Sequence, residues 1–255
     1  MQLIVPMAGL GSRFANAGYE TPKPLIPVGG KPMVVRVVEH LPRAEKIVFI
    51  VHREHVERFD IDTHLRDQFP SCEVVVAPGL TEGQACTVRL AAEVVDPDDD
   101  VLIAACDAAH VYDCGKFQAL TETPDIDGAV WTYRGECRVA IKQTSYGWVQ
   151  TDGNRVLNVS CKVPISDQPL DEHVISGFFW FRRASEVFST IDQLVASDER
   201  VNNEFYMDVI PNLYIARNQR IDAFEVDKYI GWGTPEDLHD YEAWEKHFAS
   251  IGANE

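Results

Sequence analysis

Apolar runs and amphipathic segments alternate along the first part of the chain. Continuous apolar runs predict buried strands at 3–6, 47–51, 73–77 and 101–106. Helical spacing of apolar residues predicts helices at 32–41, 54–69 and 83–95. Strands that are apolar throughout and alternate with helices are typical of a parallel sheet covered on both faces. The pattern therefore predicts an α/β fold with a Rossmann-like, mostly parallel sheet flanked by helices over about residues 1–125.

The pattern of apolar and polar residues changes after residue 127. Short β-rich pieces follow at 128–133, 138–142, 147–150, 155–160 and 176–181, with a further strand at 221–226. Asp152-Gly153 lies between two of these pieces and indicates a hairpin. Helices are predicted at 184–197, 204–217 and 235–248. Because we find no linker, low-complexity tract or repeat, we expect one domain over 1–255, with a mixed-sheet half over about 126–255.

A glycine loop follows the first predicted strand, with Gly9 and Gly11 in a GxG pattern. A dinucleotide-binding fingerprint would require a third glycine where Phe14 stands. A P-loop would require Ser or Thr after Gly30-Lys31, and Pro32 stands there. The remaining interpretation is a longer loop whose backbone N–H groups hold a triphosphate while basic side chains neutralise it.

The distribution of charge agrees with an anion site near this loop. The 255 residues include 23 Lys and Arg and 40 Asp and Glu, a net charge of −17, which argues against nucleic-acid polymers and anionic membranes as partners. Residues 1–38 nevertheless contain four basic residues and one acidic residue, a local charge of +3, which leaves −20 for the rest. The basic residues of this segment are Arg13, Lys23, Lys31 and Arg36.

The cysteines and the first residues of the chain indicate the cellular compartment in which the protein is expected. Six scattered cysteines without a CxxC pair favour a reducing environment over disulfides or zinc. The first residues lack the basic region of a signal peptide, and no apolar stretch approaches the length of a membrane span. We therefore expect a cytoplasmic protein. Its oligomeric state is left open, with a homo-oligomer as one option.

The segment MAGLGSRF, followed by TPKPLIPVGGKPM, resembles the nucleotidyltransferase family that includes sugar-1-phosphate nucleotidylyltransferases such as glucose-1-phosphate thymidylyltransferases. The resemblance implies their GT-A type fold, a Rossmann-like sheet with a mixed-sheet acceptor half. It also implies attack by an acceptor phosphate on the α-phosphorus of a nucleoside triphosphate, with release of pyrophosphate and assistance from Mg²⁺. Such a reaction requires mainly positioning and charge neutralisation from the protein.

The resemblance assigns roles to residues of the first half. Ala8, Gly9, Gly11 and Arg13 match the triphosphate loop, with Arg13 on the departing pyrophosphate. Lys23 matches the lysine beside the α-phosphate, so Arg13 and Lys23 are the expected catalytic residues. Asp107 matches the metal-binding aspartate, and the end of a parallel strand is where α/β sheets bind ligands. Gln84 opens the segment that recognises the base, although its amide could equally cap a helix.

In the second half, three positions match the acceptor pocket. Gly147 and Gly177 match glycines whose backbone approaches the acceptor, and each could instead serve a turn or bulge. Lys162 matches the lysine that contacts the acceptor phosphate.

Two positions depart from the family pattern. Cys161 stands where the family usually has a glutamate that binds sugar hydroxyls, which weakens the case for an ordinary hexose 1-phosphate. Gly231 stands where a second metal-binding aspartate is frequent. Asp227 is our preferred replacement, with Glu225 as the alternative, and either could be a solvated acid instead.

The sequence thus favours a Mg²⁺-dependent nucleotidylyltransferase that makes an activated small molecule, and the resemblance implies surface polysaccharide or a related glycoconjugate as its destination. The acceptor is a sugar 1-phosphate or another phosphorylated small molecule such as phosphocholine, and CTP is a reasonable candidate among the triphosphates. The alternative is a catalytically silent nucleotide-binding regulatory subunit. A nucleotide-dependent dehydrogenase ranks third, because Phe14 replaces the required glycine.

Overall fold

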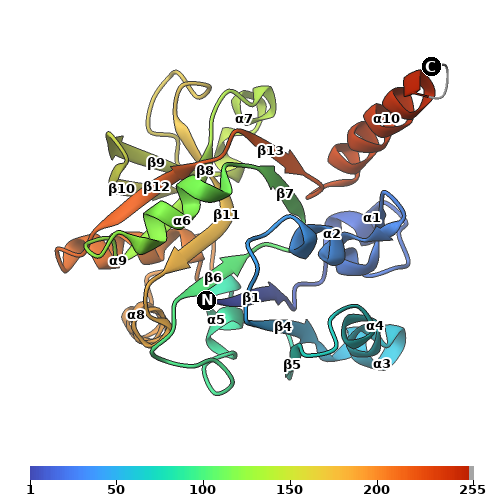
Figure 1. The fold of residues 1–255 in the computed structure, drawn as a ribbon, viewed down its shortest axis with the longest axis horizontal. Helices are drawn as coiled ribbons and strands as arrows, with labels where there is room; N and C mark the ends of the chain where they lie inside the picture. The colour runs from blue at the N-terminus through green and yellow to red at the C-terminus, as the bar shows by residue number, and fades with distance from the viewer. Residues whose placement is uncertain (253–255) are drawn as a thin grey trace.

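The computed structural model describes residues 1–252 and is built around one nine-stranded mixed sheet. The strand order is β5-β4-β1-β6-β11-β8-β12-β10-β9 (Figure 1). The first four strands are β5 (Glu73–Ala77), β4 (Lys46–His52), β1 (Gln2–Met7) and β6 (Val101–Ala104), and they run parallel. This part matches the four strands predicted from the apolar runs.

The second half of the sheet is mixed, so the description of a mostly parallel, Rossmann-like sheet holds only for the first four strands. β11 (His173–Phe181) runs antiparallel to both β6 and β8 (Gly128–Tyr133). β12 (Ile221–Glu225) is parallel to β8, whereas β10 (Arg155–Cys161) and β9 (Gly147–Asp152) form an antiparallel hairpin at the edge. The predicted hairpin at Asp152-Gly153 is confirmed.

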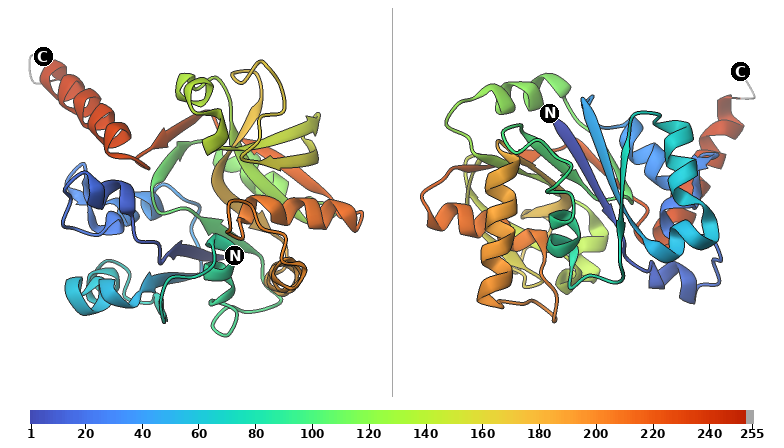
Figure 2. Two further views of the ribbon diagram at one scale, coloured as in Figure 1. Left: turned by 180° about the vertical axis from the view of Figure 1, so that it is seen from behind. Right: turned by 90° about the horizontal axis from the view of Figure 1, so that it is seen from below.

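Both faces of the sheet are covered, as continuous apolar strands require. Leu3, Val5 and Met7 point into one core, and Ile4 points into the other. The first core is covered by α2 (Met33–Glu39), α4 (Ile61–Gln68) and α6 (Cys114–Glu122), and the second by α5 (Gln84–Arg89), α8 (Ala184–Ser197) and α9 (Ile210–Ala216). Figure 2 shows these two helical layers from behind and from below.

The remaining elements are short, except for the last helix. They are α1 (Ser12–Asn16), α3 (Arg53–Phe59), α7 (Cys137–Ile141), the 3-10 helices η1 (Lys23–Leu25), η2 (Gln143–Ser145) and η3 (Met207–Val209), and the strand pairs β2 (Pro27–Val28) with β3 (Lys31–Pro32) and β7 (Ala108–Val111) with β13 (Lys228–Gly231). α10 (Pro235–Gly252) projects from the body of the molecule in both figures.

Several predicted elements differ from the structure. Residues 138–142 were predicted as β, and most of them lie in helix α7. The predicted helix 54–69 is broken at Asp60, whose φ of 48° is left-handed. Only 84–89 of the predicted helix 83–95 is α-helical, and the predicted helix 204–217 becomes η3 followed by α9. Among the described residues, no helix is long and apolar enough to cross a membrane.

Candidate active site

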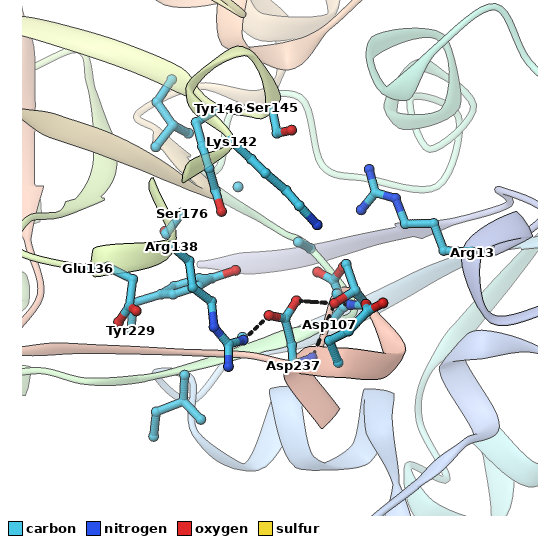
Figure 3. Close-up of a pocket in the computed structure, with 18 of the residues that line it drawn as sticks. Arg13, Asp107, Glu136, Arg138, Lys142, Ser145, Tyr146, Ser176, Tyr229 and Asp237 are labelled. Carbon is cyan, nitrogen blue, oxygen red and sulfur yellow. Dashed lines mark hydrogen bonds and ion pairs between the residues drawn. The ribbon is translucent and has the colours of Figure 1, made fainter. Parts of the chain in front are cut away.

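A cleft of about 1190 Å³ lies between the two halves of the sheet, and residues of both halves line it. The first half contributes Arg13, Gln84 and Asp107. The second half contributes Gly147, Lys162 and Gly177. Six of the residues predicted from the sequence therefore meet in one cavity, part of which Figure 3 shows.

The glycine loop connects β1 to α1 and leaves backbone donors unused. Ala8 is buried at the end of β1. Gly11 has a φ of +60°, and a methyl group on it would lie 3.1 Å from the Lys23 Cβ, so glycine lets the loop approach that lysine. Within residues 1–252, the N–H groups of Gly9, Leu10 and Gly11 donate no hydrogen bond. Such free N–H groups suit an anion.

Arg13 lies on α1 at the rim of the cleft. Its side chain is exposed and forms no hydrogen bond or ion pair with the described chain. Figure 3 shows the guanidinium extending toward the cavity. An unpaired arginine at this position is available for a phosphate group, which it can bind with two parallel hydrogen bonds.

Lys23 and Asp107 form an ion pair through Nζ and Oδ2. Their side chains are only 18% and 25% exposed, so the pair is largely shielded from solvent. Burial lowers the pKa of Lys23, but the Asp107 carboxylate outweighs it and the net pKa is raised. Lys23 therefore stays charged at neutral pH. Its side chain lines a neighbouring pocket of about 570 Å³ together with Gly11, while Asp107 lines the main cleft.

Asp107 is held in place by the pairing of β7 with β13, two short strands that the sequence pattern did not predict. It follows β6 and precedes β7, which pairs with β13 in the register Ala108 with Gly231. The Trp232 N–H donates a 2.7 Å hydrogen bond to the Asp107 carbonyl oxygen. A segment more than one hundred residues away in the chain thus fixes the position of this carboxylate.

The second expected carboxylate does not reach the cleft. Asp227 is exposed and does not line the cavity, and Glu225 is paired with Arg134 at 2.7 and 2.8 Å. At Gly231 a methyl group would lie 2.8 Å from the Tyr229 ring, so this ring occupies the space of any larger side chain there.

Asp237 lies closer to Asp107 and was missed by sequence analysis. A methyl group on Gly233 would lie 3.1 Å from Asp107 Oδ2 and 4.0 Å from Asp237 Oδ2, which places both carboxylates around one point (Figure 3). Asp237 Oδ2 accepts hydrogen bonds from the Thr234 N–H and hydroxyl, at 3.1 and 2.8 Å, and Oδ1 is paired with Arg138. The Thr-x-x-Asp spacing at the start of α10 was the available signal, because it is typical of a helix cap.

These donors fit a Mg²⁺ ion. Mg²⁺ binds through one or two carboxylates and completes its shell with water and substrate phosphate oxygens. Asp107 offers carboxylate oxygens at the cleft, and Asp237 lies close to it as a second carboxylate. No group of three or more acidic, histidine or cysteine ligands is found in residues 1–252, so substrate oxygens would have to complete the shell.

Gln84 is the first residue of α5 and lines the cleft. The preceding Gly83 has a φ of +131°, and a methyl group on it would lie 2.5 Å from the backbone of Phe205. The Ala85 N–H donates to the Phe205 carbonyl, and the Phe205 N–H donates to the Glu82 carbonyl, at 3.0 and 2.8 Å. Glycine at 83 therefore allows close backbone packing that fixes Gln84 at the cavity.

The two glycines of the second half are sterically required. Gly177 has a φ of +88° at an irregularity in β11, and a methyl group on it would lie 3.2 Å from the Ala105 Cβ. A methyl group on Gly147 would overlap the Asp208 carboxylate and lie 2.9 Å from Ile175 Cδ1. Each position therefore brings backbone to the cleft where a side chain would not fit.

Lys162 follows β10 with a φ of 65°. Its Nζ donates to the Ser145 carbonyl oxygen at 2.5 Å and lies 5.0 Å from the centre of the Tyr206 ring. The lysine is thus anchored in the part of the cleft that the second half of the chain lines. Tyr133 and Tyr229 stack on each other nearby, with ring centres 4.3 Å apart. Sequence analysis gave these aromatic residues no role, because spacing does not show which aromatic rings face a cleft.

Comparison with known proteins identifies the family. The model of the MobA-like NTP transferase domain matches residues 3–200. A search of curated proteins finds no significant match.

Solved structures share the fold at low sequence identity. The nucleoside-diphosphate-sugar pyrophosphorylase from Vibrio cholerae is 21% identical with a TM-score of 0.75, covering 94% of this chain and 98% of that one. The inositol-1-phosphate CTP transferase from T. maritima is 15% identical with a TM-score of 0.73, covering 94% and 93%. A putative glucose-1-phosphate thymidylyltransferase from Bacillus anthracis is 18% identical with a TM-score of 0.72, covering 95% and 94%.

The family match spans most of the chain, and the α/β fold agrees with that of solved nucleotidyltransferases. The chain therefore belongs to the MobA-like NTP transferases, a family of nucleotidyltransferases.

Proposed function

We propose that this chain joins a nucleoside triphosphate to a phosphorylated small molecule and releases pyrophosphate. The observation that carries the proposal is the partly buried Lys23–Asp107 ion pair beside a cleft that Arg13 and Lys162 also line. Arg13, Lys23 and Lys162 come from separate elements and lie in or beside this cleft, in a chain with a net charge of −17. That arrangement suits two phosphorylated substrates and a metal ion.

In the proposed reaction, a phosphate oxygen of the acceptor forms a bond to the α-phosphorus of the triphosphate. The bond between the α-phosphorus and the bridging oxygen of the pyrophosphate breaks, and the electron pair leaves with the pyrophosphate. Lys23 stabilises the charge that develops on the α-phosphoryl oxygens, and Arg13 stabilises the departing pyrophosphate. Lys162 holds the acceptor phosphate. No protein nucleophile is needed, since positioning and neutralisation supply the catalysis.

Asp107 would hold Mg²⁺, which, when bound, neutralises phosphate charge. We favour Asp237 over the originally expected Asp227 as the second carboxylate, because Asp227 lies outside the cleft. The free N–H groups of the glycine loop would hold the triphosphate, and Gln84 would contact the base. Side-chain amides can pair with several base edges, so the proposal leaves the base open and keeps CTP in the test.

Lys23→Met tests the catalytic proposal. Removing a preorganised positive charge from the transition state should lower kcat by about 100- to 1000-fold. Lys31→Met is the matched control, because Lys31 is 47% exposed, belongs to the same basic segment and pairs with Glu39 away from the cleft.

The assay is pyrophosphate release by the full chain with Mg²⁺, four nucleoside triphosphates, and glucose 1-phosphate, inositol 1-phosphate or phosphocholine as acceptor. Turnover by the natural chain that is lost in Lys23→Met but kept in Lys31→Met supports the proposal. Equal rates for the two variants would contradict the role of Lys23.

One observation favours a second candidate, a catalytically silent nucleotide-binding subunit. The Tyr229 ring fills the space beside Gly231, so the family's usual second aspartate cannot stand there. Binding of a triphosphate without pyrophosphate release for any acceptor of the panel would select this alternative.

A further inference from the structure

Asp208 is a carboxylate in the wall of the cleft that the proposed reaction does not use. It lies in η3, lines the cavity, and is only 7% exposed. Gly147 passes so close to it that any side chain at that position would overlap the carboxylate. The backbone of β9 and this carboxylate therefore form one continuous piece of the acceptor side of the cleft.

The carboxylate has few partners for a buried charge. Within the described chain, its one side-chain hydrogen bond comes from the Cys161 thiol at 3.8 Å, and its own backbone N–H is the only other donor. Lys162 forms no ion pair with it and donates instead to the Ser145 carbonyl oxygen. Burial raises the pKa of Asp208, as expected for a charge that lacks donors. The carboxylate oxygens therefore keep unused capacity to accept hydrogen bonds.

Ser176 provides an unpartnered polar group on the same cleft. The residue is 6% exposed, and no partner for its hydroxyl is found among residues 1–252. It lies on β11 directly before Gly177 and lines the cavity (Figure 3). Buried polar groups normally have partners, so a carboxylate with spare acceptor capacity and an unpartnered hydroxyl in the lining of one cleft point to a ligand that completes them.

The Cys161 thiol cannot replace the glutamate carboxylate that the family usually has at this position. Burial, followed by the nearby Asp208, raises the pKa of the thiol to about 12, so it stays neutral and is a weak hydrogen-bond former. Asp208 lies directly beside it. We propose that Asp208 is the specificity-determining residue of the acceptor half, and that it accepts hydrogen bonds from hydroxyl groups of the acceptor. This inference rests on the proposed function.

The same geometry favours a polyhydroxylated phosphate over a phosphate ester of a quaternary amine. A quaternary ammonium would be attracted by the Asp208 charge, but it has no proton to donate to Asp208 or Ser176, and its recognition would also need open aromatic faces. In the cleft, Tyr133 and Tyr229 stack on each other, and the Tyr206 ring lies under the Lys162 ammonium. Among the other aromatic residues of the lining, Tyr241 packs edge-on against Trp232 and Trp244 stacks on Phe248, which leaves Tyr146 without a ring partner in the described chain. One open ring does not form an aromatic cage.

Asp208→Asn tests the inference, because it keeps the size of the side chain and removes the charge. In the pyrophosphate-release assay we expect the KM for the polyol phosphate acceptor to rise about 10- to 100-fold, with the KM for the triphosphate unchanged. Asp152→Asn is the control, since Asp152 is exposed at the far end of the same strand as Gly147. Calorimetric titration of glucose 1-phosphate, inositol 1-phosphate and phosphocholine gives a readout independent of turnover.

Deoxy derivatives of the best polyol phosphate distinguish direct contact from an effect through Lys162. In the natural chain, one deoxy derivative should bind about 10-fold more weakly than its parent. In Asp208→Asn the difference in affinity between the parent and that derivative should become smaller, because a neutral amide oxygen accepts a weaker hydrogen bond from the hydroxyl than a carboxylate does.

The outcomes separate the two proposals. Asp208-dependent binding without pyrophosphate release would reject the proposed reaction and keep this inference. Pyrophosphate release with an unchanged acceptor KM in Asp208→Asn would reject this inference alone, as would tighter binding of phosphocholine than of both polyol phosphates. A melting temperature of Asp208→Asn at least equal to that of the natural chain excludes misfolding as the cause, because a sparsely partnered buried charge has been removed.

Discussion

His110 is a buried histidine whose substitution should change how stability depends on pH. It lies on β7 and is 4% exposed, and neither ring nitrogen has a hydrogen-bond partner within residues 1–252. The ring packs edge-on against Phe178 and Trp131, with centroid distances of 4.3 and 5.4 Å. Burial, with a smaller effect of His40, lowers the pKa of His110 from 6.5 to about 3.

The lowered pKa of His110 determines how the free energy of unfolding changes with pH. Because the pKa is lowered in the folded state, the unfolded chain binds the proton first, and acid favours unfolding. Stability from this residue is complete above pH 6.5 and is lost as the pH falls toward 3. The loss amounts to about 1.4 kcal/mol at pH 5.5 and about 2 kcal/mol at pH 5.0. At pH 5.5 and 5.0 the loss of stability depends little on the exact pKa of His110 in the folded state, because that pKa lies far below both pH values.

His110→Phe removes the titrating group and keeps a flat ring against Phe178. Urea unfolding of both proteins at pH 7.5, 5.5 and 5.0 measures the free energy of unfolding, and the natural chain should lose about 2 kcal/mol more than the variant between pH 7.5 and 5.0. For a chain of this size, that is about 4–8 °C in melting temperature.

His64→Gln, an exposed change on α4, is the control and should follow the natural chain. A difference between natural chain and His110→Phe below about 0.5 kcal/mol over this pH range would refute the reasoning, because a buried unpartnered imidazole must cost more to protonate.

Two further substitutions test the cleft. Gly177→Ala places a side chain at a φ of +88° and 3.2 Å from Ala105 Cβ, so it should lower the free energy of unfolding by about 1–3 kcal/mol in a urea titration. Gly79→Ala, which meets no atom within 4 Å, should change it little. Asp107→Asn should weaken Mn²⁺ binding, followed by electron paramagnetic resonance with a non-hydrolysable triphosphate, by about 10-fold or more. Asp227→Asn should leave that binding unchanged, and the reverse order would contradict our choice of ligands.

The strands of the first half could be predicted because each is apolar at nearly every position. Strands β1, β4, β5 and β6 are local patterns that a buried parallel sheet requires. The short strands β7 and β13 have no such pattern, since each pairs only with the other across a long stretch of chain. Short segments of this kind depend on tertiary contacts that spacing does not show.

The candidate site divides in the same way. The loop glycines and Lys23 belong to a contiguous motif, so sequence alone could single them out. Asp208 lies within the predicted helix 204–217 and received no role from the sequence, because its place beneath Gly147 depends on the packing of η3 against the β9–β10 hairpin. The helix α7 was mistaken for a strand because five residues are too few to display a helical period, and Arg138 within it pairs with Asp237 from a distant segment.

The place of β11 in the sheet has a consequence for biosynthesis. β6 lies between β1 and β11, and β11 follows it in the chain only after β8, β9 and β10. As the chain leaves the ribosome, the four parallel strands can assemble early, but one side of β6 stays an unpaired apolar edge until residues 173–181 emerge. Such an edge can pair with another nascent chain. The Asp107 carbonyl also lacks its hydrogen bond from Trp232 until that residue has been made, so we expect this side of the cleft to take its final form only when synthesis is nearly complete.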